Sequence, residues 1–421
     1  MSHPVTDFES LQPLFDTFAD KQYVLLGEAS HGTREFYTWR REISKKLIKD
    51  YGFSFIAVEG DWPDCYRINR YVKGYPDSGI SAHEVLYTFN RWPTWMWANW
   101  ENVELIDWLQ KYNNDMSEEK KIGFYGLDVY SLWDSLREII TFLKKNDPDA
   151  IDAAIKAYQC FEPYNEDPHQ YARAVMLVPK SCEDEVVSLL KTLQQIKPKN
   201  NGDHEAFFNA EQNAIVIKNA EKYYRTMIHG GANSWNTRDT HMVETLERLM
   251  EFHGKDAKGI VWAHNTHIGD ARYTDMHETG EVNIGHLVRE QHGEERVSLV
   301  GFSTYKGNVI ASVAWDEPME RMPAPKALPG SWDALLHESS PNDKLLLFNS
   351  GNIPEELFTV KGQRAIGVVY VPEHEFGNYV PTVLPRRYDG LLFFDTTHAV
   401  SPLHIKEARD EDFPETYPWA V

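Results

Sequence analysis

The sequence has few cysteines and no long apolar segment. Its 421 residues include only Cys65, Cys160 and Cys182, which are odd in number and widely spaced. This usage predicts a reduced, cytoplasmic protein without a disulfide framework. No apolar stretch reaches the roughly 18 residues of a membrane span. The first 30 or so residues also lack the basic start and apolar run of a signal peptide. We therefore expect no membrane partner.

Basic residues are in the minority. The chain has 43 Lys and Arg against 64 Asp and Glu, for a net charge of −21. Because nucleic acids and anionic membranes are themselves negative, this charge disfavours both as partners. Hydrophobic residues at 42% and charged residues at 25% are typical of a globular protein and exclude general disorder. The length predicts about two or three structural units, or one large α/β domain with an insertion.

Several common catalytic motifs are missing. Neither Ser30, which has Glu28 two residues before it, nor Ser303 lies in a Gly-x-Ser-x-Gly elbow. No His-Glu dipeptide continues to the His-Glu-x-x-His of zinc proteases, and both phosphate-loop and dinucleotide-binding glycine motifs are absent. Cys65 is better explained as a small buried hydrophobe than as a nucleophile. Nucleophilic catalysis therefore has weak support, and phosphate-loop and dinucleotide-binding functions are disfavoured.

Short apolar runs alternate with amphipathic stretches in the first 150 or so residues and again after residue 259. The predicted strands are 23–26, 53–58, 122–125, 259–262, 297–300, 344–348, 365–370 and 391–394. Predicted helices cover 33–50, 64–72 and a segment that includes Leu136 and Leu143. Alternation of this kind predicts an α/β fold with a central, largely parallel sheet flanked by helices.

Residues 148–252 have a different pattern. Long amphipathic stretches such as 183–195 and 205–227 dominate, and the polar segment 198–203 separates them as a loop. We expect a helical insertion or cap at 148–252. The α/β catalytic core would then consist of residues 1–147 and 253–421.

Ionisable residues gather where the predicted strands end. Such clusters occupy 27–33, 59–62, 126–128, 263–267 and 395–398. In open α/β sheets, ligands bind outside the carboxyl ends of the strands. Burying so many acids and imidazoles is costly unless they are paired or functional. If the strands are parallel, the five clusters share one rim, and we expect an active-site cleft there.

Glu28 and His31 form the first candidate pair. A carboxylate three residues before a histidine can hydrogen-bond the imidazole, which fixes its tautomer and raises its basicity. The flanking Gly27 and Gly32 allow a sharp turn and close approach. The alternative is a helix N-terminus at which Ser30 or Thr33 caps and His31 only packs.

His264 and His267 have the i, i+3 spacing that places two imidazoles on one side of a turn. Together with Glu28, His31 and Glu59 they have the composition of a divalent-metal site, although the spacing is weakly specific. The alternative is a pair of structural loop histidines. Metal-free and metal-dependent mechanisms both stay open.

Four tryptophans lie within residues 90–100. They could line a large apolar pocket, or they could pack in the core beneath a loop. From this segment we select Trp92 and Trp95 as candidate substrate-binding residues, together with Asp61 and Asp128 from the strand ends. Arg40, in the first helix, could turn inward to pair with the acids and polarise a carbonyl.

Three segments together carry a family resemblance: Gly27-Glu28-Ala29-Ser30-His31-Gly32-Thr33, Ala57-Val58-Glu59-Gly60-Asp61 and Trp262-Ala263-His264-Asn265-Thr266-His267. The sequence resembles the erythromycin esterase family, which includes members labelled as succinoglycan biosynthesis proteins, over about residues 8–400. The resemblance implies an α/β core, a helical lobe and a deep cleft between them. It also implies hydrolysis of a macrolide lactone by water without a covalent acyl-enzyme.

The resemblance also implies roles for individual residues. His31 would be the general base, oriented by Glu28; His264 and His267 would line the cleft, and Arg40 and Glu59 would complete the polar network. Family members differ in their sensitivity to chelators, so the resemblance leaves metal dependence open.

Three hypotheses follow. The first is a carboxylic ester hydrolase that acts on a bulky ester or lactone without a cofactor. The second is a divalent-metal hydrolase with Glu28, His31, Glu59, His264 and His267 as ligands, because a bound metal lowers the pKa of water. The third is a protein that sequesters an apolar ligand, which would not need the clustered imidazoles and carboxylates.

Overall fold

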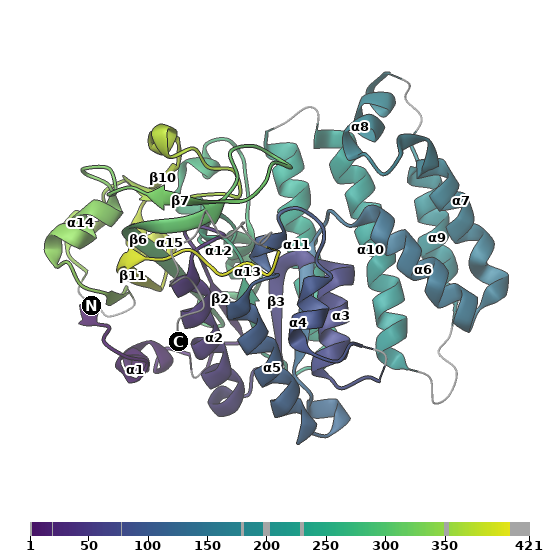
Figure 1. Cartoon of the computed structure of the whole chain (residues 1–421), viewed down its shortest axis with the longest axis horizontal. Helices are drawn as coiled ribbons and strands as arrows, with labels where there is room; N and C mark the ends of the chain where they lie inside the picture. The colour runs from purple at the N-terminus through teal and green to yellow at the C-terminus, as the bar shows by residue number, and fades with distance from the viewer. Residues whose placement is uncertain are drawn as a thin grey trace, which may run out of the picture.

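The computed structural model describes residues 2–404 except 19, 77, 178–180, 197–202, 228–230 and 349–352. Its main sheet has the strand order β1-β8-β11-β6-β2-β5-β3-β4, with β7 paired to β6 (Figure 1). The strands of this sheet are β1 (Ser2–Pro4), β2 (Tyr23–Leu26), β3 (Phe55–Asp61), β4 (Gly123–Asp128), β5 (Gly259–Trp262), β6 (Val297–Ala311), β7 (Glu320–Ala324), β8 (Lys344–Leu347) and β11 (Gly390–Thr397). A separate ribbon pairs β9 (Lys361–Arg364) with β10 (Tyr379–Thr382).

Six neighbouring strands, from β11 through β6, β2, β5 and β3 to β4, are parallel. β8 is antiparallel to β11, and β1 to β8. The predicted α/β fold with a largely parallel sheet is therefore confirmed. Trp262 at the end of β5 pairs with Leu26 of β2 on one side and Val58 of β3 on the other. This register brings the polar segments that follow the three strands to adjacent places on one edge.

Helices occupy much of the rest of the chain. They are α1 (Gln12–Phe15), α2 (Arg34–Tyr51), α3 (Trp62–Val72), α4 (Ala82–Tyr87), α5 (Trp100–Asn114), α6 (Leu132–Asn146), α7 (Ile151–Phe161), α8 (Pro168–Leu177), α9 (Glu183–Gln195), α10 (His204–Met227), α11 (Ala232–His253), α12 (Asn265–Ile268), α13 (Ile284–His292), α14 (Trp332–Ser339) and α15 (Leu384–Arg387). α2 follows its predicted range closely. It ends at Gly52, whose positive φ of 72° lets its N–H reach the carbonyl of Leu47.

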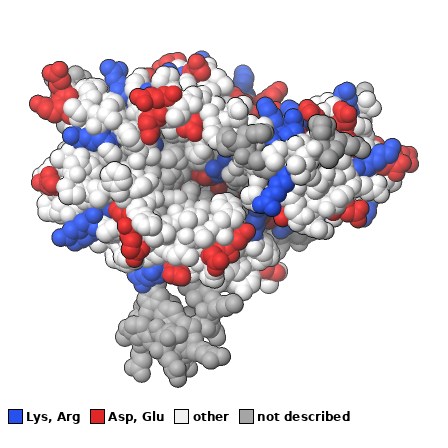
Figure 2. All heavy atoms as spheres, turned by 90° about the horizontal axis from the view of Figure 1, so that it is seen from above, with Lys and Arg blue, Asp and Glu red and all other residues white. Residues whose placement is uncertain are grey.

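The two faces of the sheet bury separate apolar cores. Side chains along a strand alternate between faces, so Val24 and Leu26 of β2 enter a different cluster from Tyr23 and Leu25. The first cluster also takes in apolar residues of α2 and α5, and the second those of α11 and α13. With helices on both faces, the strand ends are left as the open edge of the sheet. The face seen in Figure 2 is hollowed near its middle, with side chains of both charges visible inside.

A third apolar cluster belongs to a helical lobe and draws its residues from 129–227 (Figure 1). α6 packs against α10 and α7 in this lobe, whereas α11 packs both against α10 of the lobe and against β4 and α13 of the sheet region. The division at 148 and 252 stays a prediction. The predicted helices at 183–195 and 205–227 correspond to α9 and α10, and most of the predicted loop at 198–203 lies outside the described residues.

Two expectations are wrong. Cys160 and Cys182 form a disulfide, and Cys65 alone is a free buried cysteine. The packing of α7 against α9 brings together two cysteines that are 22 residues apart in sequence. Residues 365–370 form no strand; they make only single bridges, at Ile366 to Ser30 and at Val369 to Ser312. Ile366 and Tyr370 instead pack with apolar residues of β6 and β7 in a small separate cluster. No helix among the described residues combines the length and apolar character needed to span a bilayer.

Candidate active site

The loop after β2 is shaped by close backbone contacts. Gly27 leaves no room for a side chain, because a Cβ there would lie 2.1 Å from Oδ1 of Asn265. A Cβ on Gly32 would lie 1.9 Å from the carbonyl oxygen of Ile310. Both glycines are therefore required for packing, and they fix the path of the segment that carries Glu28 and His31.

Glu28 joins a histidine and an arginine below the surface. Its Oε1 lies 2.9 Å from Nδ1 of His31, and its Oε2 accepts a hydrogen bond of 2.6 Å from Nη2 of Arg40. Arg40 is fully buried, and its guanidinium lies over the rings of Tyr37 and Trp262. With Nδ1 of His31 donating to the carboxylate, the other ring nitrogen, Nε2, keeps its lone pair for a substrate or water.

Glu59, at the end of β3, is the centre of the second group. Its Oε2 accepts from the backbone N–H of His264 at 2.8 Å, and its Oε1 accepts from Nη2 of Arg238 at 2.7 Å. Burial alone would raise the pKa of Glu59, but the neighbouring His267, His31 and Arg238 outweigh burial and hold this pKa well below the usual range. Glu59 is therefore an ionised, fully hydrogen-bonded carboxylate.

His264 lies beside His31, with 4.9 Å between the ring centroids. Its Nδ1 accepts from the backbone N–H of Thr266 at 3.3 Å and lies 2.8 Å from that residue's Oγ1. Burial first and the neighbouring His31 second lower the pKa of His264 well below its ordinary value. A neutral ring that accepts at Nδ1 carries its proton on Nε2. This buried Nε2 has no partner in the structure, so it is a free hydrogen-bond donor next to His31.

His267 has partners at both of its ring nitrogens and on one face of its ring. Both carboxylate oxygens of Asp239 lie within 3.0 Å of its Nδ1. Its Nε2 lies 3.3 Å from Oε1 of Glu59 and 3.1 Å from Nη1 of Arg238, and the ring stacks on Trp235. Burial would lower its pKa, but Asp239 and Glu59 outweigh burial and raise the pKa to about 9. His267 is therefore charged at neutral pH.

The two residues of α11 in this network, Arg238 and Asp239, were not predicted. Arg238 binds Glu59 and also both carboxylate oxygens of Asp128, at 3.0 and 2.6 Å. The residues that flank Arg238 and Asp239 in the amphipathic helix α11 do not indicate that these two polar side chains face inward. An arginine followed by an aspartate in such a helix is usually a solvated ion pair, so no sequence signal separated them from surface residues.

The predicted substrate-binding acids have arginine partners. Asp128 is bound by Arg238, and Asp61 accepts from Nη1 of Arg91 at 2.8 Å. Burial raises the pKa of Asp61, and Arg91 opposes that rise only in part. Asp64, in the first turn of α3, has a pKa raised to about 7 by burial and by the charge of Asp61.

The tryptophan segment is divided between core and rim. Trp95 is buried in the apolar core below the segment, whereas Trp92 is half-buried and packs against Trp315, with 4.6 Å between the centroids of the two tilted rings. Trp97, which was not selected, donates from Nε1 to the backbone carbonyl of Glu59 at 3.2 Å. Of the two selected tryptophans, Trp92 is the one with an exposed face.

The fifth predicted cluster reaches the same edge of the sheet, because Thr33 and Ala399 form a bridge and the N–H of Val400 donates to the carbonyl of Gly32. Its charged side chains pair separately from the network around Glu28 and Glu59. Asp395 pairs with His337 on α14, and His398 pairs with Glu35 at the start of α2. The other four clusters are linked through Glu28, Glu59, Asp128 and the two histidines.

In the part of the chain that the structure describes, no three or more His, Cys, Asp or Glu side chains are arranged to hold a metal ion. Of the five alternative ligands, Glu28 and Glu59 have arginine partners, and both nitrogens of His267 are engaged. The residues as placed do not fit the metal-site hypothesis.

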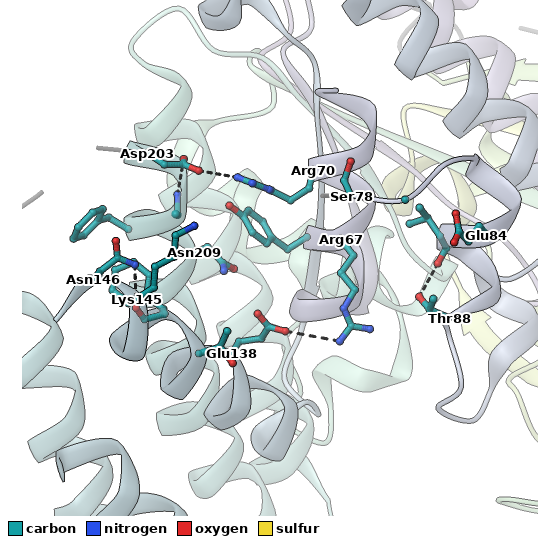
Figure 3. A pocket seen from close by; sticks show the side chains of 17 residues that line it. Arg67, Arg70, Ser78, Glu84, Thr88, Glu138, Lys145, Asn146, Asp203 and Asn209 are labelled. Atoms are coloured by element: carbon teal, nitrogen blue, oxygen red, sulfur yellow. Dashed lines mark hydrogen bonds and ion pairs between the residues drawn. The ribbon is translucent and has the colours of Figure 1, made fainter. Parts of the chain in front are cut away.

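A pocket of about 580 Å³ lies elsewhere, between α3 and α4 on one side and α6 and α10 on the other (Figure 3). Arg70 is paired with Asp203 and Arg67 with Glu138 across it. None of its lining residues belongs to the polar network described above.

The model of the erythromycin esterase family matches residues 48–397 of this chain. Erythromycin esterase type II of Escherichia coli is 20% identical over 418 residues, which cover 93% of each chain. A solved structure of a Bacillus cereus protein has a TM-score of 0.79 at 20% identity, covering 95% of this chain and 96% of its own. A succinoglycan biosynthesis protein has a TM-score of 0.76 at 20% identity and covers 95% of each chain. A mutant of the erythromycin esterase EreC in its open conformation has a TM-score of 0.66 at 16% identity, covering 94% of this chain and 98% of its own.

Proposed function

The chain belongs to the erythromycin esterase family, and from this premise we propose that it hydrolyses a carboxylic ester or lactone with water activated by His31. The observation that carries the proposal is the pairing of two neighbouring imidazoles of opposite character. His31 presents a basic nitrogen, and His264 presents an unpartnered N–H beside it.

His31 acts as the general base. Glu28 fixes its Nδ1–H tautomer, and Arg40 fixes Glu28, so Nε2 of His31 is oriented to take a proton from water as the oxygen attacks the carbonyl carbon. The proton on His31 then passes to the departing alkoxide. The carboxylate of Glu28, held by Arg40 and hydrogen-bonded to Nδ1, faces the imidazolium formed on the way and stabilises it.

His264 donates to the oxyanion. As the carbonyl oxygen gains negative charge, the buried N–H of His264 offers a hydrogen bond that costs no rearrangement. Glu59 holds the backbone of His264 in place, His267 and Arg238 keep Glu59 charged and oriented, and Asp239 holds His267. We assign His267 to positioning, not to contact with substrate, because both of its ring nitrogens already face partners within the protein.

For the substrate we propose a bulky ester or macrocyclic lactone. Support comes from the family, from the relative named erythromycin esterase type II, and from the half-buried Trp92 at the rim. Glu28 and Glu59, the two carboxylates next to the imidazoles, are each paired with an arginine. Because their charges are already balanced, the proposed mechanism needs no resident cofactor.

The test is a mass-spectrometric screen of macrolides, simpler lactones and acyl esters for addition of water, run with and without chelator. On any substrate found, His31→Ala should lower kcat at least about a hundredfold, and His264→Ala by about 10²–10³. Circular dichroism of both variants checks that they fold. Near-normal turnover by folded His31→Ala would remove the proposed base. Activity that is lost with chelator and restored by one metal would favour the metal mechanism instead.

A further inference from the structure

Exposed apolar side chains gather at the turn between β6 and β7. Trp315 is 57% exposed, Val313 48%, and Val369, in the neighbouring segment, 37%. Ser312 pairs with Val369 in a parallel bridge, so Val369 lies on a segment adjacent to the one that carries Val313 and Trp315. Together with Trp92 we call them the aromatic wall.

One side of the aromatic wall is anchored to the loop that carries His31. The N–H of Ile310 donates to the carbonyl of Gly32, and the N–H of Ile366 donates to that of Ala29. Val313 and Val369 each follow their anchor by three residues. Three residues of extended chain cover about 10 Å, so the wall begins within the length of a bulky ester from the backbone of the proposed base.

The other side is anchored near Glu59. Trp97 donates to the carbonyl of Glu59. Five residues earlier, Trp92 packs against Trp315 with the rings tilted by 52° and donates from Nε1 to the carbonyl of Glu317 at 2.9 Å. In the sheet, β2 and β5 lie between β6 and β3. The contact between Trp92 and Trp315 therefore bridges the strand ends that carry His31 and His264.

The turn itself is well fixed. The hydroxyl of Ser312 lies 2.8 and 3.1 Å from the carbonyl oxygens of Ala314 and Glu317, and the N–H of Glu317 donates to Ala314. Asp316 takes the left-handed conformation that closes the turn, with φ of 63°. Trp315 is thus held outward on a defined backbone, as a binding surface requires.

We propose that Trp315 is a specificity-determining residue and that, with Trp92, it binds the apolar group of the ester. The inference rests on the proposed function for the location of the reacting carbonyl. An indole with an exposed face next to a second indole offers a large contact area at little cost in conformational entropy. A long acyl chain or a macrocycle can cover this area, whereas an acetyl group is too short to reach it.

The experiment compares Trp315→Ala with Trp100→Ala, a tryptophan of similar exposure (51%) that stacks on His83 instead. The probes are p-nitrophenyl acetate, p-nitrophenyl octanoate and the uncleaved amide N-phenyloctanamide. Trp315→Ala should raise KM for the octanoate and Kd for the amide about tenfold, with kcat and the acetate unchanged. Trp315→Phe should recover most of the loss, and Trp100→Ala should behave as wild type.

The outcomes separate the two proposals. Amide binding that is insensitive to Trp315→Ala, or equal losses on acetate and octanoate, would overturn the aromatic wall. A wild-type protein that cleaves none of the esters or lactones would refute the proposed function. Amide binding that still depends on Trp315 in that case would support the wall as an apolar binding surface.

Discussion

At the scale of single residues, His267 shows how neighbouring carboxylates set the charge of an imidazole. Asp239 contacts Nδ1 and Glu59 faces Nε2, so the protonated ring is favoured although only 2% of the residue is exposed. Its pKa is raised from 6.5 to about 9. The imidazole of His267 therefore binds a proton more tightly in the folded chain than in the unfolded chain.

This difference predicts a pH-dependent contribution to stability. The stabilisation is complete below about pH 6.5 and is lost as pH rises through about 9, because the unfolded chain loses the proton first. The free energy of unfolding of wild type minus that of His267→Gln should fall by on the order of 3 kcal/mol from about pH 7 to about pH 10. Urea denaturation at a series of pH values measures it.

The control is His241→Gln. Burial lowers the pKa of His241 to about 4, so this residue is neutral in both states across the same pH range. Its difference from wild type should stay nearly constant. A flat profile for His267→Gln would show that Asp239 and Glu59 do not hold the proton.

Residue by residue, the sequence located one half of the candidate site. Glu28 and His31 are near in sequence, so their contact follows from local spacing. Arg238 and Asp239 reach the site only through the packing of α11 against the sheet. No local pattern contains that long-range contact.

At the scale of elements, the end of β6 and the loop after β2 depend on one another. The carbonyl of Gly32 accepts from Ile310, and a Cβ on Gly32 would lie 1.9 Å from the Ile310 carbonyl oxygen. Neither backbone segment can move away without breaking a hydrogen bond of the other.

Gly32→Ala should therefore displace the loop that carries His31. Overpacking of this kind costs about 1–3 kcal/mol, so we expect a lower Tm and a kcat/KM reduced at least about tenfold. Gly367→Ala is the matched control, because a Cβ at Gly367 meets nothing within 4 Å. Calorimetry and ester hydrolysis measure the two effects. Wild-type activity of Gly32→Ala would mean that the contact does not set the position of His31.

Periodicity predicted the central elements well. The runs at 23–26 and 259–262 are β2 and β5, because fully buried parallel strands are continuously apolar. The same reasoning failed at 365–370, where Ile366 and Tyr370 are apolar because they pack against β6 and β7. Burial alone does not distinguish a strand from an extended segment that is paired at single residues.

At the scale of the whole molecule, the disulfide stabilises the lobe and not the sheet. Cys160 and Cys182 enclose α8 and the segments around it. The three cysteines of the sequence could not reveal this pair, since the packing of α7 on α9 brings them together.

Replacing both cysteines with serine should lower the free energy of unfolding by about 2–4 kcal/mol, since the unfolded chain loses a covalent loop of 22 residues. Chemical denaturation followed by circular dichroism measures the change. Reductant should lower the stability of wild type by a similar amount and leave the double variant unaffected. Equal sensitivity of the two proteins to reductant would contradict the pairing.

The order in which β2, β3, β4 and β5 enter the sheet has a consequence for biosynthesis. Glu28, Glu59, Asp128 and Arg238 are all made before His264, yet β5 lies between β2 and β3 and must insert among strands synthesised much earlier. A nascent chain on the ribosome thus contains His31 without His264 until more than half of the polypeptide has been translated. The two neighbouring imidazoles can come together only after β5 has inserted between β2 and β3.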